Sequence, residues 1–229
     1  MRKRPILISI IIPTLNEEKN LENLLEQLRK LKTERTEIIV SDGGSTDKTR
    51  SVAERFADTT VISQRGRALQ MNAGANYATG EILWFLHSDS KLYFDYEAEI
   101  ISQLSTRSWG WCTTKIDSAK WIFRLIESMM NLRSKMTRIA TGDQGFFVRK
   151  TSFIQVNKFP EIALMEDIVM SRNLKKVGVP YVSKKEIHTS SRKWEREGPI
   201  RTIFRMWMLR ARFFFGASPE RLAKAYYRT

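Results

Sequence analysis

The stretch Ile82–Ser90, "ILWFLHSDS", decides how the whole sequence is interpreted. Its five apolar residues, Ile82–Leu86, predict a buried strand, and the run stops abruptly at His87. Asp89 follows at once, and a carboxylate fixed at the end of a rigid strand is typical of a metal ligand. The competing interpretation is a turn whose polar residues only cap a following helix.

Upstream of this strand, short apolar runs alternate with helical periods. Strands are predicted at 6–12 and 37–40, and helices at 17–31, 46–57 and 68–78. This alternation is the signature of βαβ units. We therefore predict an α/β fold with a Rossmann-like, mostly parallel sheet flanked by helices, and a ligand crevice beyond the carboxyl ends of its strands.

Downstream of Ser90 the regular alternation of predicted strands and helices ends. Helices are predicted at 93–104, 119–137 and 166–177, and shorter strands at 109–114 and 145–149. The final segment mixes apolar residues with arginines, which predicts an amphipathic C-terminal helix that lies either on the core or on an anionic membrane surface. The arginines in question are Arg201, Arg205, Arg210 and Arg212.

Composition narrows the class of protein. One cysteine, Cys112, excludes an internal disulfide, so we expect a cytoplasmic protein, either free or peripheral on the inner face of the membrane. The formal net charge of +14 indicates a polyanionic partner: nucleic acid, anionic lipid or phosphorylated small molecules. The sequence contains no run of 18 apolar residues, so no membrane span is predicted. The N-terminal run Ile6–Ile12 resembles a leader sequence, but polar Ser9 interrupts it, and we interpret it as a strand.

Four polar clusters fall at the ends of successive predicted strands: "PTLNEE", "SDGGSTDKT", "SQRGRALQMNAG" and "HSDS". Such a crevice suits a nucleotide, because Asp42 can accept a hydrogen bond from a base and Arg67 can donate to a base carbonyl or phosphate. Neither a Gly-x-Gly-x-x-Gly nor a Gly-Lys-Ser/Thr loop is present to hold a diphosphate. A divalent cation at Asp89, Mn²⁺ or Mg²⁺, is the natural substitute.

In this order the motifs resemble the family 2 glycosyltransferases over roughly Ile6–His188. The resemblance implies the GT-A fold, a nucleotide-diphosphate sugar donor of the UDP or GDP type, a divalent metal, inversion at the sugar, and a hydroxyl acceptor. It also implies a catalytic domain at 1–196, with a nucleotide-binding half at 1–90 and an acceptor-binding half at 91–196, followed by the helical tail at 197–229.

The resemblance also assigns roles to single residues. Asp167 would be the general base, with Glu166 beside it, although both also fit the acidic first turn of a helix. Asp89 would bind metal, with His87 and His188 as further candidates; His87 is alternatively a ribose contact or a hydrogen-bond donor to a metal ligand. The candidates for nucleotide binding are Pro13, Thr14, Asn16, Glu17, Asp42, Ser45, Arg67, Asn72 and Ser88, and those for acceptor binding are Gly142, Asp143, Gln144 and Trp194.

Two departures from the family pattern refine the expectation. His87 replaces the first Asp of the metal motif, and "SSRKW" stands where processive members have Gln-x-x-Arg-Trp, which favours transfer of a single sugar. "FLHSD", "GDQGFFVR" and "HTSSRKWEREGPIRT" resemble a bacterial subgroup associated with arsenosugar biosynthesis. Two alternatives stay open: a polyprenyl-phosphate sugar transferase at the membrane surface, and a nucleic-acid-binding protein, which the dispersed basic residues disfavour.

Overall fold

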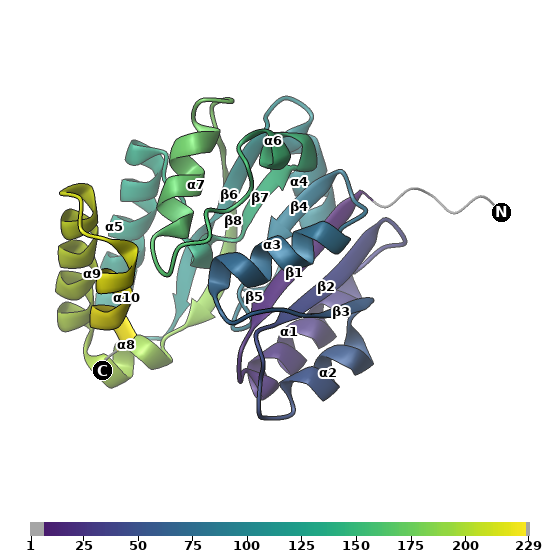
Figure 1. The fold of residues 1–229 in the computed structure, drawn as a ribbon, viewed down its shortest axis with the longest axis horizontal. Helices are drawn as coiled ribbons and strands as arrows, with labels where there is room; N and C mark the ends of the chain where they lie inside the picture. The colour runs from purple at the N-terminus through teal and green to yellow at the C-terminus, as the bar shows by residue number, and fades with distance from the viewer. Residues whose placement is uncertain (1–6, 228–229) are drawn as a thin grey trace.

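The computed structural model describes residues 7–227, apart from the side chain of Lys193. The first six residues of the leader-like stretch and the last two of the tail lie outside this range. The described chain forms one eight-stranded sheet in the order β3-β2-β1-β4-β7-β6-β8-β5 (Figure 1). The strands are β1 (Ile8–Thr14), β2 (Thr36–Asp42), β3 (Thr59–Ile62), β4 (Ile82–Phe85), β5 (Lys91–Leu92), β6 (Trp109–Asp117), β7 (Phe146–Arg149) and β8 (Tyr181–Ser190).

Neighbouring strands β3, β2, β1 and β4 are parallel, as predicted. β7 joins β4 in the antiparallel sense, and β6 and β8 then run parallel to each other. The predicted α/β fold with a mostly parallel sheet is therefore confirmed. Because four parallel strands lie side by side, their carboxyl ends and the loops that follow meet at one edge of the sheet.

Helices cover both faces of the sheet. On one face lie α1 (Glu18–Leu31), α2 (Thr49–Phe56) and α4 (Tyr96–Leu104), whose apolar residues share a core with Trp84. On the other lie α3 (Arg67–Tyr77), α6 (Lys150–Gln155) and α7 (Glu166–Leu174), which pack with Phe85. Neighbours in β4 thus face opposite layers, and this strand, buried on both sides, is the rigid element that its sequence predicts.

The residues after β4 do not cap a helix. The backbone N–H of Ser90 donates to the His87 carbonyl at 3.1 Å, and the chain continues into β5 before α4 begins. Asp95 caps α4 instead, because its carboxylate accepts from two backbone N–H groups of the first turn. The competing interpretation of Ile82–Ser90 as a helix cap is therefore wrong.

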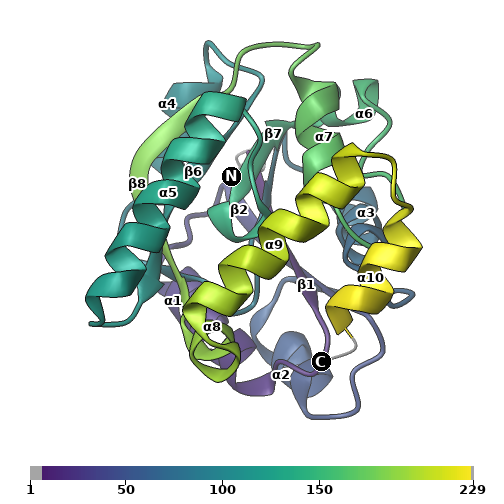
Figure 2. The same ribbon diagram turned by 90° about the vertical axis from the view of Figure 1, so that its left-hand side faces the viewer.

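The C-terminal segment forms three helices, α8 (Arg192–Glu197), α9 (Pro199–Phe214) and α10 (Pro219–Tyr227). Figure 2 shows α9 crossing the face of the molecule between α5 (Trp121–Thr137) and α10. Leu209 and Leu222 bury their side chains against α7. None of the helices within residues 7–227 is long and apolar enough to cross a membrane.

Candidate active site

The strand-end clusters meet as the topology requires. Thr14 and Asp42 are register partners at the ends of β1 and β2, and the Gly43 N–H donates to the Thr14 carbonyl at 2.9 Å. The N–H of Ser63, after β3, donates to the Asp42 carbonyl at 2.9 Å. The Leu86 N–H, after β4, donates to the Ile11 carbonyl at 3.0 Å. Four separate stretches of sequence thus build one edge.

The loops after β1 and β2 are hydrogen-bonded to each other. The Asn16 N–H donates to Ser45 Oγ at 2.8 Å, and Asn16 Oδ1 accepts from the Thr46 N–H at 2.8 Å. The Glu17 N–H donates to Thr49 Oγ1 at 2.8 Å. Asn16 has a φ of 55°, which asparagine tolerates better than most residues, and it bridges the loops instead of capping α1. The two loops therefore form one rigid wall.

Asp42 is buried and organises its own loop. Its Oδ2 accepts from the N–H groups of Gly44 at 3.1 Å and Ser45 at 2.9 Å, and its Oδ1 accepts from the Ser45 hydroxyl. These contacts hold the chain in a tight turn, with Gly44 at a φ of 90°. Asp42 and Ser45 thus shape the predicted nucleotide wall through the backbone that they fix.

Three of the predicted site residues make contacts within the fold, and their roles in ligand binding stay predictions. The Asn72 side chain pairs with the Phe159 backbone, donating at 2.9 Å and accepting at 3.1 Å, so it joins α3 to a distant loop. Gln144 is fully buried and its Oε1 accepts from Ser134 and Thr141. Trp194 packs with the apolar cluster of α5. The buried amides of Asn72 and Gln144 thus have partners within the protein, as buried polar groups generally do.

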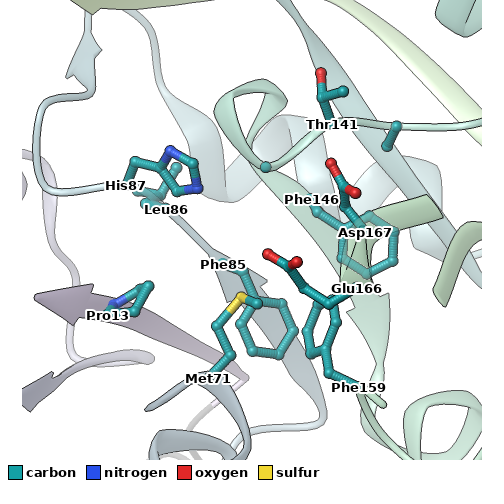
Figure 3. A pocket seen from close by; sticks show the side chains of 12 residues that line it. Pro13, Met71, Phe85, Leu86, His87, Thr141, Phe146, Phe159, Glu166 and Asp167 are labelled. Carbon is teal, nitrogen blue, oxygen red and sulfur yellow. The ribbon is translucent and has the colours of Figure 1, made fainter. Parts of the chain in front are cut away.

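One pocket opens beside the strand ends (Figure 3). Its free volume of about 20 Å³ is about that of one water molecule. His87 lies on one side and Glu166 and Asp167 on the other. The apolar walls are missing from the sequence-based set because they come from separate elements: Met71, Phe85, Leu86, Ala140, Phe146 and Phe159, with Pro13, Thr141 and Gly142 completing the lining.

His87 is held neutral. Burial, and then the nearby Arg67 cation, lower the pKa of its imidazole to about 4, against the opposing influence of Asp89 and Asp143. Its Nε2 is buried and has no hydrogen-bond partner within the described chain. A neutral imidazole nitrogen without a partner is a group that a metal ion or a ligand hydroxyl can satisfy.

The His87 ring edge packs directly on Gly142. A Cβ built on Gly142 would lie 2.5 Å from His87 Nε2 and 2.8 Å from Cε1, so a side chain at this position would have to displace the His87 ring. Gly142 begins the short 3-10 helix Gly142–Gln144, which is closed by a reciprocal pair of hydrogen bonds between Thr141 and Gln144. The predicted acceptor residue Gly142 therefore lines the pocket on a braced turn, and Asp143 follows it in the same turn.

Substituting Gly142 should disturb the site. We expect Gly142→Ala to push His87 from its position and to lower the free energy of unfolding by about 1–3 kcal/mol, as overpacking does. Activity should fall with it. Gly178→Ala is the matched control, because its Cβ would meet only Ser108 Oγ, at 3.6 Å. Equal turnover and equal denaturant midpoints for the two variants would contradict this role of Gly142.

The two carboxylates at the start of α7 differ in their surroundings. Glu166 is buried and forms an ion pair with Arg67, with 3.7 Å between Oε1 and Nη1. Burial, and then the Glu166 charge, raise the pKa of Asp167 to about 7, although Arg67 opposes this. A carboxylate with a pKa near neutrality, facing a pocket, is suited to taking a proton.

The backbone before these carboxylates is strained. Met165, buried in the contact with α9 and α10, has a φ of 73° and a ψ of 18°, a conformation that costs about 1–3 kcal/mol in a residue other than glycine. The N-terminal end of α7 would favour ionised carboxylates, yet burial dominates at Asp167. The C-terminal helices thus help to fix where Glu166 and Asp167 point.

Arg133 is a buried cation that the sequence analysis did not single out. It projects from α5, and its Nη2 donates to Ser134 Oγ at 2.8 Å, while its Nη1 is buried and has no partner in the described chain. Asp143 and Asp167 both act on the pKa of Arg133, which burial lowers. An arginine on an otherwise apolar helical stripe gives no sequence signal by itself.

The metal prediction fits the structure in part. Asp89 makes no hydrogen bond or ion pair within the described chain, and together with the orphaned His87 Nε2 it offers one oxygen and one nitrogen ligand. His188 lies within β8, packs its ring on Tyr93 at 4.7 Å between centroids, and has as its register partner Lys91, which follows Asp89 closely in the chain. Over residues 7–227, no three His, Cys, Asp or Glu side chains gather to hold a metal.

Comparison with known proteins assigns this sequence to a family. Residues 9–157 match the family described as Glycosyl transferase family 2. The 4,4'-diaponeurosporenoate glycosyltransferase of Staphylococcus haemolyticus is 29% identical over 59% of this chain and 38% of its own length. A PGL/p-HBAD biosynthesis glycosyltransferase of Mycobacterium bovis is 35% identical over 43% of this chain and 40% of its own length. The chain thus spans about two fifths of these curated relatives.

Solved structures show the same fold. TarS of S. aureus, in a crystal structure of residues 1–349 with UDP-GlcNAc, superposes with a TM-score of 0.66 at 22% identity, covering 81% of this chain and 58% of that one. The mannosyltransferase PcManGT of Pyrobaculum calidifontis, with GDP-Man and Mn²⁺, gives 0.63 at 20% identity, covering 82% and 59%. The GT-A fold is confirmed. The proteins named here give no support to the narrower arsenosugar resemblance.

Proposed function

Because the chain belongs to glycosyl transferase family 2, we propose that it transfers one sugar from a nucleotide-diphosphate sugar to a hydroxyl acceptor, with inversion at the anomeric carbon. The observation that carries the proposal is the meeting of four polar strand ends beside one pocket that Asp167 faces. Neighbours of the same fold hold UDP-GlcNAc or GDP-Man, which supports a donor of the UDP or GDP type.

The joined loops after β1 and β2 supply the proposed nucleoside site. Pro13 lines the pocket, and Thr14 Oγ1 is buried without a hydrogen-bond partner in the described chain, so a ligand group can satisfy it. Arg67, at the first turn of α3, has a half-exposed side chain whose guanidinium can donate hydrogen bonds to a phosphate. Ser88, which is buried next to Asp89, completes the set.

Asp167 is the proposed general base. The acceptor oxygen attacks the anomeric carbon, a new C–O bond forms on one face, and the bond to the diphosphate breaks on the other. Attack on the face opposite the leaving group inverts the configuration. As the new C–O bond forms, Asp167 takes the hydroxyl proton and becomes a neutral carboxyl group. Glu166 assists by holding Arg67 and by raising the pKa of Asp167.

Asp89 and His87 are the residues that would hold Mn²⁺ or Mg²⁺. The two side chains are too few to bind the ion tightly, so the remaining ligands would be oxygens of the donor diphosphate and water. When bound, the cation neutralises charge on the leaving diphosphate. The neighbour with GDP-Man and Mn²⁺ supports a metal of this class.

The polyprenyl-phosphate alternative differs in its acceptor. A phosphate oxygen is already ionised and needs no base, so Asp167 would matter little to the rate. Arg133, whose buried Nη1 has no partner among residues 7–227 and whose charge interacts with Asp143 and Asp167, is the observation that favours an anionic acceptor group. The raised pKa of Asp167 favours the hydroxyl acceptor, and we retain that as the main proposal.

A thermal-shift screen tests the donor proposal. Nucleoside diphosphates and nucleotide sugars are added with Mn²⁺ or with a chelator. A ligand at 100 times its Kd should stabilise the native state by about 2.7 kcal/mol. We expect one nucleotide to raise the melting temperature only with Mn²⁺, and Mn²⁺ alone to bind weakly, because the protein supplies two ligands. A nucleotide-independent metal site, or no response to any nucleotide, would contradict the proposal.

A further inference from the structure

Helices α5 and α9 each carry a second, exposed apolar stripe opposite the face that packs on the protein. On α5 the exposed residues recur at intervals of three or four, as residues on one helical face do. Each is more than half exposed except Met129, which is 39% exposed. They are Trp121, Leu125, Met129, Leu132 and Met136.

The stripe on α9 has the same form. Thr202 and Leu209 are buried on its inner side, and the opposite side presents large apolar groups to solvent. Phe214 and Phe215, at its end, are 72% and 84% exposed and stack edge to face. The exposed residues of this stripe are Ile200, Phe204, Trp207, Met208, Phe214 and Phe215.

The two helices are neighbours. Ile203 of α9 and Phe123 of α5 belong to one apolar cluster, and Figure 2 shows both helices on the same side of the molecule. Monomeric proteins rarely leave large apolar surfaces uncovered. We define the α5/α9 face as the two exposed stripes together, and we infer that it docks on an anionic membrane surface.

The charge of the α5/α9 face favours a membrane over other binding partners. α9 contains four arginines and no acidic residue, and the only acidic residue of α5, Glu127, is buried and accepts from the Ile116 N–H. Lys135 and Arg138 are exposed near the end of α5, and Arg201 and Arg212 are exposed on α9. Pairing with a second copy would bring like charges together, whereas anionic headgroups complement them.

The sequence-based prediction for the tail is corrected in one respect. Arg205 does not face outward: its guanidinium forms an ion pair with Glu197 of the preceding helix, so it braces α8 against α9. The half-buried Arg210 lies on the other flank of the stripe. Trp121 on α5 and Trp207 on α9 suit the headgroup region of a membrane, where one edge of the ring stays in contact with water. The face therefore reaches beyond the tail to an internal helix.

Vesicle co-sedimentation tests the inference directly. The full chain is mixed with vesicles of phosphatidylcholine and phosphatidylglycerol at 3:1, or of phosphatidylcholine alone, at low and high salt. We expect binding to the anionic vesicles that weakens in high salt. Phe204→Glu and Leu132→Glu should each weaken it about tenfold or more, since each removes an exposed apolar side chain that the membrane would bury.

The matched control is Ile62→Glu, an exposed apolar residue on β3 at the far edge of the sheet. It should bind vesicles as the wild type does. Equal loss in all three variants, or no binding of the wild type to anionic vesicles at low salt, would overturn the inference. A dimer in sedimentation equilibrium that Leu132→Glu disrupts, without vesicle binding, would assign the face to a second copy instead.

Discussion

Replacing Asp167 by Asn should reduce kcat by about 10² to 10⁴, the usual contribution of a positioned base, while the affinity for the donor stays nearly unchanged. The side chain faces the pocket, and its carboxylate can accept the proton of the acceptor hydroxyl, which the amide of Asn cannot do. Asp117→Asn is the control, an exposed carboxylate that pairs with Lys91. Near-normal turnover by the Asp167 variant would favour a phosphate acceptor, which needs no base.

The same variant should change how stability depends on pH. The folded-state pKa of Asp167, about 7, lies above the ordinary value of 3.8. Between these values the folded state binds more protons than the unfolded state, so the stability of the wild type falls as pH rises from 4 to 7. Asp167→Asn lacks this contribution. Between pH 4 and pH 7 its free energy of unfolding, measured in urea, should therefore fall by on the order of 2 kcal/mol less than that of the wild type. Identical slopes would show that Asp167 ionises freely.

Asp89→Asn has the second large expected effect. It keeps the shape of the side chain but removes the charged oxygen ligand, so turnover should fall by about 100-fold, equivalent to about 3 kcal/mol. The rise in melting temperature that a nucleotide and Mn²⁺ produce together should disappear. Folding should not suffer, because Asp89 makes no hydrogen bond or ion pair within the described chain.

His87→Asp separates two roles for the histidine. It places the commoner family residue next to the metal position, and under the metal-ligand role turnover persists with a changed preference between Mn²⁺ and Mg²⁺. Loss of turnover together with normal metal response would instead assign the imidazole to packing on Gly142. Wild-type turnover and metal response in Asp89→Asn would place the metal elsewhere and refute the assignment.

Local periodicity accounts for what the sequence predicted well. β4 is a continuous apolar run, β1 is mostly isoleucine with Ser9 interrupting it, and the leucine stripe of α1 repeats at helical spacing. The predicted bounds of these three elements are therefore correct to within a few residues. β8 was not given bounds, because it mixes four charged or imidazole side chains with apolar ones and is half exposed. β5, only two residues long, has no pattern at all.

The meeting of the strand-end loops could be predicted from the sequence, whereas the long-range side-chain contacts around them could not. Asp89 and Asn16 lie directly after strands, so topology brings their loops together. Asn72 was assigned to the nucleotide because it sits in a polar cluster, but a loop 87 residues further along the chain takes its amide. Arg133 belongs to an amphipathic helix, and only packing places it beside Asp143 and Asp167.

A crystal structure of the chain with a UDP- or GDP-sugar and Mn²⁺ tests the central proposal most directly. We predict the nucleoside against the joined loops of Asn16 and Ser45, the diphosphate over Asp89 with Mn²⁺ between them, and the anomeric carbon facing Asp167. A nucleotide bound away from the strand ends, or a metal that contacts neither Asp89 nor His87, would contradict the account.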